Sequence, residues 1–253
     1  MTGPRAGAGV RLERSRGEQR ADLSIEIPPV NVLDPGALAE LAAQVAAAPP
    51  ARLLVLHGLP RAFSAGVDVA VHAPEPAAIE EMLSAMRRVL AALCETPAVT
   101  LAAVSGACLG GGAEIVSACD LVLVAEDARI GFPEIRLACF PPGAAALLPI
   151  RIGEARAAEW ILSGETYSGR QAAAAGFAAR AVEAARLEAE TERLSERLLS
   201  ASAAALSAAR DLVRRRRREA LARDLPAAED AYRRLAGSED LERAVREFEA
   251  SRR

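Results

Sequence analysis

The sequence predicts an α/β fold built on a layered, largely parallel sheet. Short apolar runs typical of buried strands, such as 53–56 and 99–104, alternate with helical patterns such as 77–94. With 253 residues and 51% hydrophobic content, the chain can bury a sizeable core. From residue 186 onward the composition changes to charged, alanine-rich helix. We therefore expect an α/β core over 1–185 and a helical region over 186–253.

The N-terminal half supplies a regular succession of elements. Alternating polar and apolar residues at 10–13 and 21–27 predict a hairpin. Asp34 and Pro35 have the character of a cap and a first helical position, for a helix that runs to about residue 47. The strand 53–56, a loop over 58–68, the helix 77–94 and the strand 99–104 follow in that order.

The second half continues the alternation. A helix follows Gly112, strands are predicted at 121–124 and 129–132, and an alanine- and leucine-rich helix follows Gly143. Two more helices are predicted at 154–162 and 168–175. The charged region after residue 186 has no strand pattern, and we expect roughly three helices there.

Composition excludes several classes of function. The net charge of −3 and the pI near 5.7 give no general attraction to nucleic acid or anionic lipid. All 31 basic residues are arginine, so a lysine Schiff base and the Gly-Lys pair of a P-loop are excluded. The N-terminus has no apolar signal region, and the longest charge-free run is short for a membrane helix and broken by glycines. We expect a cytoplasmic protein.

Histidine and cysteine give no sign of a metal site. His57 and His72 do not form a metal-spaced pair, and neither has the serine or cysteine motif of a triad, so structural or surface roles are expected. The cysteines lie in apolar surroundings without CxxC spacing, which predicts buried free thiols in a reducing compartment. They are Cys94, Cys108, Cys119 and Cys139.

A glycine-rich stretch with one carboxylate organises the site. After the apolar run 99–104, four glycines fall within seven positions, 106–112, and Glu114 follows in almost uncharged surroundings. Glycines at a strand-to-helix turn leave backbone amides accessible, and the positive end of the helix dipole points the same way. The spacing does not match a dinucleotide-binding fingerprint. The simpler alternative is a tight turn whose glutamate stabilises a helix start.

Two further segments extend this pattern. Residues 64–68 follow a strand and could supply another backbone amide, although Asp68 could be a simple cap. Glu134 comes 20 residues after Glu114, at the end of a strand and after Pro133. Taken alone, each glutamate is more often a helix-start residue than a catalyst. A pair of carboxylates, however, is what acid and base chemistry on a carbon skeleton requires.

Together these segments resemble the enoyl-CoA hydratase/isomerase (crotonase) family, from the N-terminal hairpin to about residue 182. The matching pieces occur in the family's order, and 158–164, 172–176, 238–240 and Phe248 resemble its later segments. The main pieces are Pro29-Val-Asn31, Phe63-Ser-Ala-Gly-Val-Asp68, Gly106-Ala-Cys-Leu-Gly-Gly-Gly-Ala-Glu114, Cys119-Asp120 and Phe132-Pro-Glu134.

The resemblance implies a fold, an assembly and a reaction. The fold would be a spiral of ββα units with a C-terminal helical trimerisation region, forming homotrimers or homohexamers. The activity would be hydration of an enoyl-CoA thioester in fatty-acid or aromatic-acid metabolism. Coenzyme A would be part of the substrate, with no other cofactor and no metal. Members that only isomerise double bonds often keep one of the two carboxylates, and this chain has both.

The resemblance also implies the site residues. The amides of Val67 and Gly111 would form the oxyanion hole for the thioester carbonyl. Glu114 would activate the water that adds at C3, and Glu134 would give a proton to C2. The Ala65 carbonyl would accept a hydrogen bond from the adenine of CoA. The remaining residues expected to contact CoA or substrate are Gly66, Asp68, Gly110 and Phe140.

One segment departs from the typical hydratase pattern. Residues 136–149 contain Phe140-Pro-Pro-Gly143 where typical hydratases have a glycine-rich proline turn. This version is more similar to cyclic dienoyl-CoA hydratases (cyclohexa-1,5-dienecarbonyl-CoA hydratase). Phe140 and the prolines would reshape the acyl pocket beside Glu134. Alanine- and proline-rich drift could imitate the same pattern.

Alternatives remain within and outside enzymes. An enoyl-CoA isomerase or a CoA-ester hydrolase would use the same oxyanion hole. A non-catalytic, RNA-binding member of the fold could act through the arginine run 214–218, which could also meet CoA phosphates. No aromatic residues interleave with the run, and such runs are more often a solvated helix face, so nucleic acid is not expected to be a partner.

Overall fold

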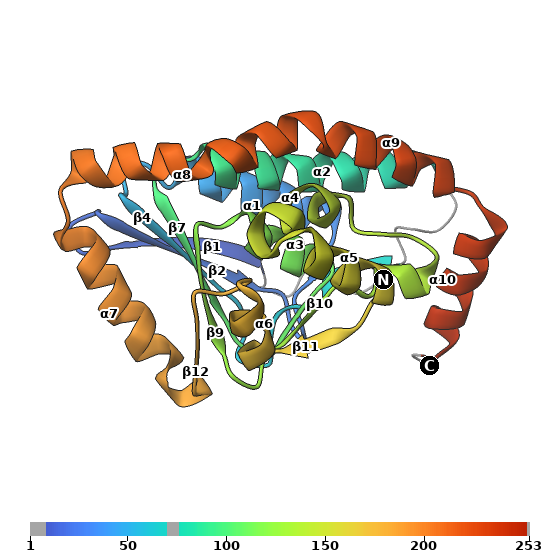
Figure 1. The fold of residues 1–253 in the computed structure, drawn as a ribbon, viewed down its shortest axis with the longest axis horizontal. Coiled ribbons are helices and arrows are strands. Elements are labelled where there is room, and N and C mark those ends of the chain that lie inside the picture. Colours follow the sequence, from blue (N-terminus) through green and yellow to red (C-terminus); the bar gives the residue numbers. More distant parts are fainter. Residues whose placement is uncertain (1–8, 70–75, 252–253) are drawn as a thin grey trace.

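The computed structural model describes residues 9–69 and 76–251, and within them it forms the predicted α/β architecture (Figure 1). The main sheet has six strands in the order β1-β2-β4-β7-β9-β12, which are parallel except at the β1–β2 hairpin. A second sheet has the order β11-β10-β8-β5, and β3 pairs with β6. His72 and the rest of 70–75 lie outside the described residues.

The bounds of the strands are β1 (Gly9–Ser15), β2 (Arg20–Glu26), β3 (Val32–Leu33), β4 (Leu53–His57), β5 (Ala62–Ser64), β6 (Gly66–Val67), β7 (Val99–Val104), β8 (Ala107–Leu109), β9 (Leu121–Ala125), β10 (Arg129–Gly131), β11 (Thr166–Ser168) and β12 (Arg180–Val182). The helices are α1 (Pro35–Ala47), α2 (Pro76–Glu95), α3 (Gly111–Ala118), α4 (Pro142–Ile152), α5 (Glu154–Ser163), α6 (Gly169–Ala175), α7 (Leu187–Ser200), α8 (Ala203–Arg223), α9 (Leu225–Leu235) and α10 (Glu239–Ser251), with 3-10 turns at Pro133–Leu137 and Ala184–Arg186.

Local sequence explains the long elements. All six residues of β7 are buried, as expected for a central parallel strand with both faces covered. Asp34 caps α1 by accepting a hydrogen bond from the Ala37 amide at 2.7 Å, and Pro35 occupies the first turn. The predicted hairpin and the main predicted helices and strands are confirmed, and the four cysteines are buried and free.

Several short strands were not predicted, although the strand expected at 129–132 is confirmed as β10. The segment 58–68 contains β5 and β6 rather than an unbroken loop, and β8 stands inside the glycine-rich stretch. The elements β11 and β12 were also missed. Each of these strands has only two or three residues, too few to show a period, and tertiary pairing alone defines them.

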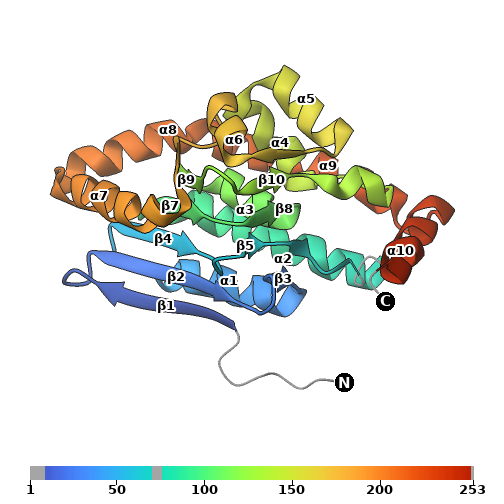
Figure 2. The same cartoon turned by 90° about the horizontal axis from the view of Figure 1, so that it is seen from below.

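The C-terminal region forms four helices, where roughly three were expected. A single residue, Asp224, separates α8 from α9, and the two helices run alongside α2 (Figures 1 and 2). Figure 2 shows α7 and α10 at opposite ends of the molecule. Helix α10 contributes Leu241 and Val245 to a small apolar cluster with Ile79 and Tyr232. No helix within the described ranges is long and apolar enough to cross a membrane.

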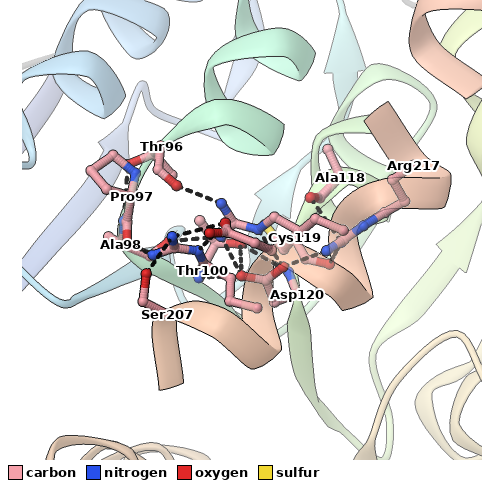
Figure 3. Close-up of polar contacts among 12 residues, drawn as sticks. Thr96, Pro97, Ala98, Thr100, Ala118, Cys119, Asp120, Ser207 and Arg217 are labelled. Atoms are coloured by element: carbon pink, nitrogen blue, oxygen red, sulfur yellow. Dashed lines mark hydrogen bonds and ion pairs between the residues drawn. The ribbon is translucent and has the colours of Figure 1, made fainter. Parts of the chain in front are cut away.

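The arginine run on α8 is not a uniformly solvated face, so that expectation is wrong for two of its members. Arg214 is 1% exposed and Arg217 is 8% exposed. Arg214 donates to the Asp120 carboxylate at 2.7 Å and to the Ala98 carbonyl at 2.6 Å. Arg217 donates to the Ala118 carbonyl at 3.0 Å, and Figure 3 shows both of these residues beside Asp120. The helical periodicity turns these two side chains inward, while Arg215 and Arg216 stay exposed.

Candidate active site

The glycine-rich stretch forms a strand, a turn and a buried helix start. Gly110 has φ +50° and ψ −125°, a conformation that favours glycine, and α3 begins at Gly111. The Gly111 amide has no acceptor within its own helix because it belongs to the first turn. Every residue of α3 is buried, including Glu114 in that first turn. The N-terminus of α3 therefore presents an amide and a helix dipole next to a buried carboxyl group.

A second backbone segment lies against this turn. Val67, in β6, pairs with Leu33 of β3, and the next amide, Asp68 N, donates to the Leu33 carbonyl at 3.0 Å. Successive amides of a strand point to opposite sides, so the Val67 amide points away from β3. A Cβ atom added to Gly111 would lie 3.5 Å from the Val67 nitrogen and 2.7 Å from Val67 Cγ1. Only glycine allows the two segments to approach this closely.

Asn31 organises the segment that carries Val67. Its fully buried side chain donates to the Phe63 carbonyl at 2.9 Å and accepts from the Ile27 amide at 2.7 Å. The Ser64 hydroxyl donates to the Asn31 carbonyl at 2.7 Å and accepts from the Gly66 amide at 3.1 Å. Asn31 belonged to a recognised sequence piece, but no role was predicted for it. Its side chain anchors β5, which leads into β6 and Val67.

Glu114 is held by the start of α4. Its Oε1 accepts a hydrogen bond from the Ala144 amide at 3.0 Å, and Gly143 contributes a second amide. A Cβ atom added to Gly143 would lie 2.9 Å from Oε1. Burial nevertheless raises the pKa of Glu114 to about 7, against the lowering effect of these amides. The unusual Phe140-Pro-Pro-Gly143 segment thus supplies one of the two amides that orient Glu114 and directly precedes the other.

Glu134 lies in the 3-10 turn Pro133–Leu137, with its carboxyl group next to Gly110. Its Oε1 would be 2.6 Å from a Cβ atom added to Gly110. Its Oε2 is buried and has no hydrogen-bond partner among the described residues. Burial, together with the nearby Glu114 charge, raises the pKa of Glu134 to about 8. Two carboxyl groups poised to exchange protons near neutral pH can act as an acid and a base.

A cavity of about 40 Å³ joins these groups. Of the predicted site residues, Val67, Glu114, Glu134 and Phe140 line it. Gly110 and Gly111 are not among its lining residues, but a Cβ atom added to them would meet Glu134 and Val67, respectively. Ala65, Gly66 and Asp68 do not line this cavity, although they adjoin Val67, which does.

Helices α2 and α9 supply lining residues that were not predicted. Met86 and Arg87 come from α2, and Leu225, Glu229 and Tyr232 come from α9. The Phe140 and Tyr232 rings pack edge to face with centroids 5.8 Å apart. The three α9 residues lie on one face of an amphipathic helix, but the sequence of α9 does not show that this face lines a cavity.

The raised pKa values predict that stability falls as the pH rises from about 5 to about 8. Both carboxyl groups bind a proton more tightly in the folded than in the unfolded chain, whose reference value is 4.5, so ionisation favours unfolding. Urea unfolding across this pH range should show that the free energy of unfolding decreases. The decrease should be smaller in Glu134→Gln. Glu81→Gln, at an exposed position on α2, should keep the wild-type slope. Equal slopes in all three proteins would contradict the assignment.

Substitution of Gly110 should damage the site more than the fold. Gly110→Ala places a methyl group against the Glu134 carboxyl, and we expect kcat to fall by about 100-fold because such displacements misplace a reacting group. Gly17→Ala is the matched control: it also has positive φ, +62°, but no atom lies within 4 Å of the added Cβ. It should lower the melting temperature without changing kcat. Equal kcat losses in the two variants would contradict the prediction.

Comparison with known proteins is consistent with this geometry. The family model described as enoyl-CoA hydratase/isomerase matches residues 19–253. The chain is 34% identical over 165 residues to a cyclohexa-1,5-dienecarbonyl-CoA hydratase of Thauera aromatica, covering 64% of this chain and 62% of that protein. It is 37% identical over 158 residues to a probable enoyl-CoA hydratase of Bacillus subtilis, covering 60% and 61%. These matches span less than two thirds of either relative.

Solved structures share the whole fold. A crystal structure of an enoyl-CoA hydratase from Mycobacterium avium subsp. paratuberculosis superposes with a TM-score of 0.87 at 25% identity and covers 96% of both chains. The structure of OdaA from Pseudomonas aeruginosa gives 0.82 at 26% identity, covering 94% of this chain and 98% of that one. The fold class predicted from the sequence is confirmed.

Proposed function

Since the chain belongs to the enoyl-CoA hydratase/isomerase family, we propose that it is an acyl-CoA hydratase that adds water reversibly across the double bond of an enoyl-CoA-type thioester. One observation carries the proposal. Two carboxyl groups with raised pKa values, Glu114 and Glu134, line the same cavity beside the glycine turn. A single carboxyl group would suffice to move a proton between two carbons of one substrate.

In the proposed mechanism, the amides of Val67 and Gly111 hold the thioester oxygen. Ionised Glu114 takes a proton from water while the water oxygen bonds to C3, and the electron pair of the double bond moves toward the thioester to give an enolate. The two amides stabilise the negative oxygen. Protonated Glu134 then gives its proton to C2. Hydration changes no net oxidation state, so the proposal needs only CoA as part of the substrate.

The acyl group is proposed to be compact, with a cyclic dienoyl-CoA as the leading candidate. The Thauera aromatica relative is named for such a substrate, and the Phe140-Pro-Pro segment lines the cavity beside Glu134. Turnover should be compared on crotonyl-CoA, a branched enoyl-CoA and cyclohexa-1,5-dienecarbonyl-CoA. Oxygen-18 from labelled water should enter the product. Release of free CoA thiol would favour a hydrolase, and a shifted double bond without labelled oxygen would favour an isomerase.

The rival function is RNA binding through α8. The exposed Arg215 and Arg216 are the side chains that could carry it, because Arg214 and Arg217 are committed to Asp120. A filter-binding assay on an Arg215→Gln, Arg216→Gln variant separates the functions. RNA binding that disappears in this variant while turnover is unchanged would revive the rival.

We also propose that the protein forms a homotrimer or homohexamer, which sedimentation analysis would test.

A further inference from the structure

One wall of the cavity is formed where α2 and α9 lie against each other. Ile79, Met82, Leu83 and Met86 from α2 and Leu225 from α9 make most of this wall apolar. Arg87 and Glu229 interrupt it. Their polar groups lie on the side of the cavity built by the two long helices, whereas Glu134 comes from the 3-10 turn.

Arg87 and Glu229 form a two-pronged ion pair. The Arg87 Nε lies 2.9 Å from Glu229 Oε1, and the Arg87 Nη2 lies 2.9 Å from Glu229 Oε2. The Glu229 side chain is 4% exposed, while the Arg87 side chain is 44% exposed. A carboxylate offers about four acceptor positions, and a guanidinium offers five donors. The second neighbours, Arg233 at 3.6 Å from Glu229 and Glu80 at 3.8 Å from Arg87, lie beyond hydrogen-bond distance, so each group can still take one more hydrogen bond.

The pair belongs to a wider ion-pair network between α2 and α9. Arg233 of α9 donates to the Glu80 carboxylate of α2 at 2.7 Å and 3.2 Å and also lies 3.6 Å from Glu229, while Glu80 lies 3.8 Å from Arg87. Arg87 and Glu229 are the members of this network that line the cavity. An ion pair in an apolar wall is often no more stabilising than apolar residues of similar volume. A cavity that accepted only hydrocarbon groups would gain nothing from it. The position of the pair therefore points to recognition of a polar group on the ligand.

We propose that Arg87 and Glu229 determine substrate specificity by binding a hydroxyl group carried by the acyl group, so that a hydroxylated relative of the cyclic dienoyl-CoA binds more tightly than the hydrocarbon itself. The hydroxyl hydrogen would be donated to the Glu229 carboxylate, and the hydroxyl oxygen would accept from an Arg87 N–H. A carboxylate on the acyl chain fits poorly, because Glu114, Glu134 and Glu229 all line the cavity. This inference rests on the proposed function, since it assumes that an acyl-CoA occupies the cavity.

The test compares thioesters that differ only by hydroxyl against methyl. Titration calorimetry would use three pairs of CoA thioesters: 6-hydroxyhexanoyl with heptanoyl, and the trans-3- and trans-4-hydroxycyclohexanecarbonyl compounds with their methyl counterparts. Because hydrogen bonds to charged groups are worth about 1.5–3 kcal/mol, the hydroxyl member of at least one pair should bind about 10-fold or more tightly than its methyl counterpart. Saturated thioesters allow binding to be measured without turnover.

Three variants locate the effect. Glu229→Gln should reduce the hydroxyl preference by about 10-fold and change binding of the methyl compounds by less than about threefold. The double variant Arg87→Met, Glu229→Leu replaces the pair with apolar side chains, avoids an unpaired charge and should prefer the methyl compounds. Glu81→Gln is the matched control: it removes an exposed carboxylate from the same helix, α2, and should retain the wild-type preference.

The outcomes separate the inference from the function. Binding of all six thioesters by the wild type without any hydroxyl preference would overturn the inference and leave the hydratase proposal standing. A preference that survives in both Glu229 variants would also overturn it. If no thioester binds, the acyl-CoA function fails and the inference fails with it.

Discussion

Glu114→Gln should lower kcat for hydration by about 1,000-fold while acyl-CoA binding stays within about threefold of the wild type. Glutamine keeps the shape of the side chain and can still accept the hydrogen bond from the Ala144 amide. It cannot take a proton from water. The loss should therefore appear in kcat rather than in KM, because the group acts only in the chemical step.

Glu134→Gln should produce a loss of similar size for a different reason. An amide cannot deliver a carboxyl proton to C2, and Oε2 of Glu134 is one of two buried side-chain oxygens without a partner among the described residues. The wild-type rate should be highest at a pH near 7–8, where one carboxyl group is ionised and the other protonated. In Glu114→Gln the remaining rate should no longer rise with pH on the acid side of the maximum. In Glu134→Gln it should no longer fall on the alkaline side.

The control is Glu81→Gln, which changes an exposed carboxylate on α2 and should retain full activity. Stopped-flow or steady-state hydration of the best substrate, together with calorimetric binding of a saturated thioester, separates chemistry from binding. Full activity in either Glu114→Gln or Glu134→Gln would exclude the mechanism with two carboxyl groups. Loss of binding in both would show instead that the residues hold the site open.

The two glutamates could be found from sequence because their surroundings are unusual locally. Glu114 follows four glycines in an apolar stretch, and Glu134 follows an apolar strand end and a proline. A carboxylate in such surroundings needs a compensating partner or a function. The same local reasoning anticipated the long strands and helices, whose periods are visible within a single segment.

The wall formed by α9 could not be found that way. Glu229 and Tyr232 lie in a charged helix, and only the fold carries them back to α2 and to the segment that contains Phe140. Asn31 is a similar case, since its partners include the carbonyls of Ala62 and Phe63, more than 30 positions further along the chain. Pairings at long range leave no period in the sequence.

The arginine run 214–218 is a further case in which the sequence does not show which side chains are buried. From sequence, 214–218 is a charged helix face, and nothing local distinguishes Arg214 from Arg215. The distinction comes from Asp120, which lies 94 positions away from Arg214. Burial alone would raise the pKa of Asp120, but the Arg214 hydrogen bonds and the two guanidinium charges hold this pKa below its ordinary value.

Asp120→Ala should therefore cost about 3–5 kcal/mol of unfolding free energy, a large part of the roughly 5–15 kcal/mol typical of a folded domain. The substitution leaves Arg214 and Arg217 buried without a counter-charge, and it removes the acceptor for the Thr100 amide at 2.8 Å. Urea unfolding at neutral pH measures the loss. In the wild type, this contribution should be present above the ordinary aspartate pKa of 3.8 and disappear as the pH falls through the lower folded value.

Arg215→Ala is the matched control on the same run. Arg215 is exposed, and its nearest acidic partner, Glu219, lies 3.7 Å away on the helix surface, so the cost should stay below about 0.5 kcal/mol. Similar losses in Asp120→Ala and Arg215→Ala would mean that the buried network adds nothing to the surface charge of α8. A selective loss in Asp120→Ala would also bear on the active site. Arg217 donates to the Ala118 carbonyl at the C-terminal end of α3, and the other end of that helix carries Gly111 and Glu114.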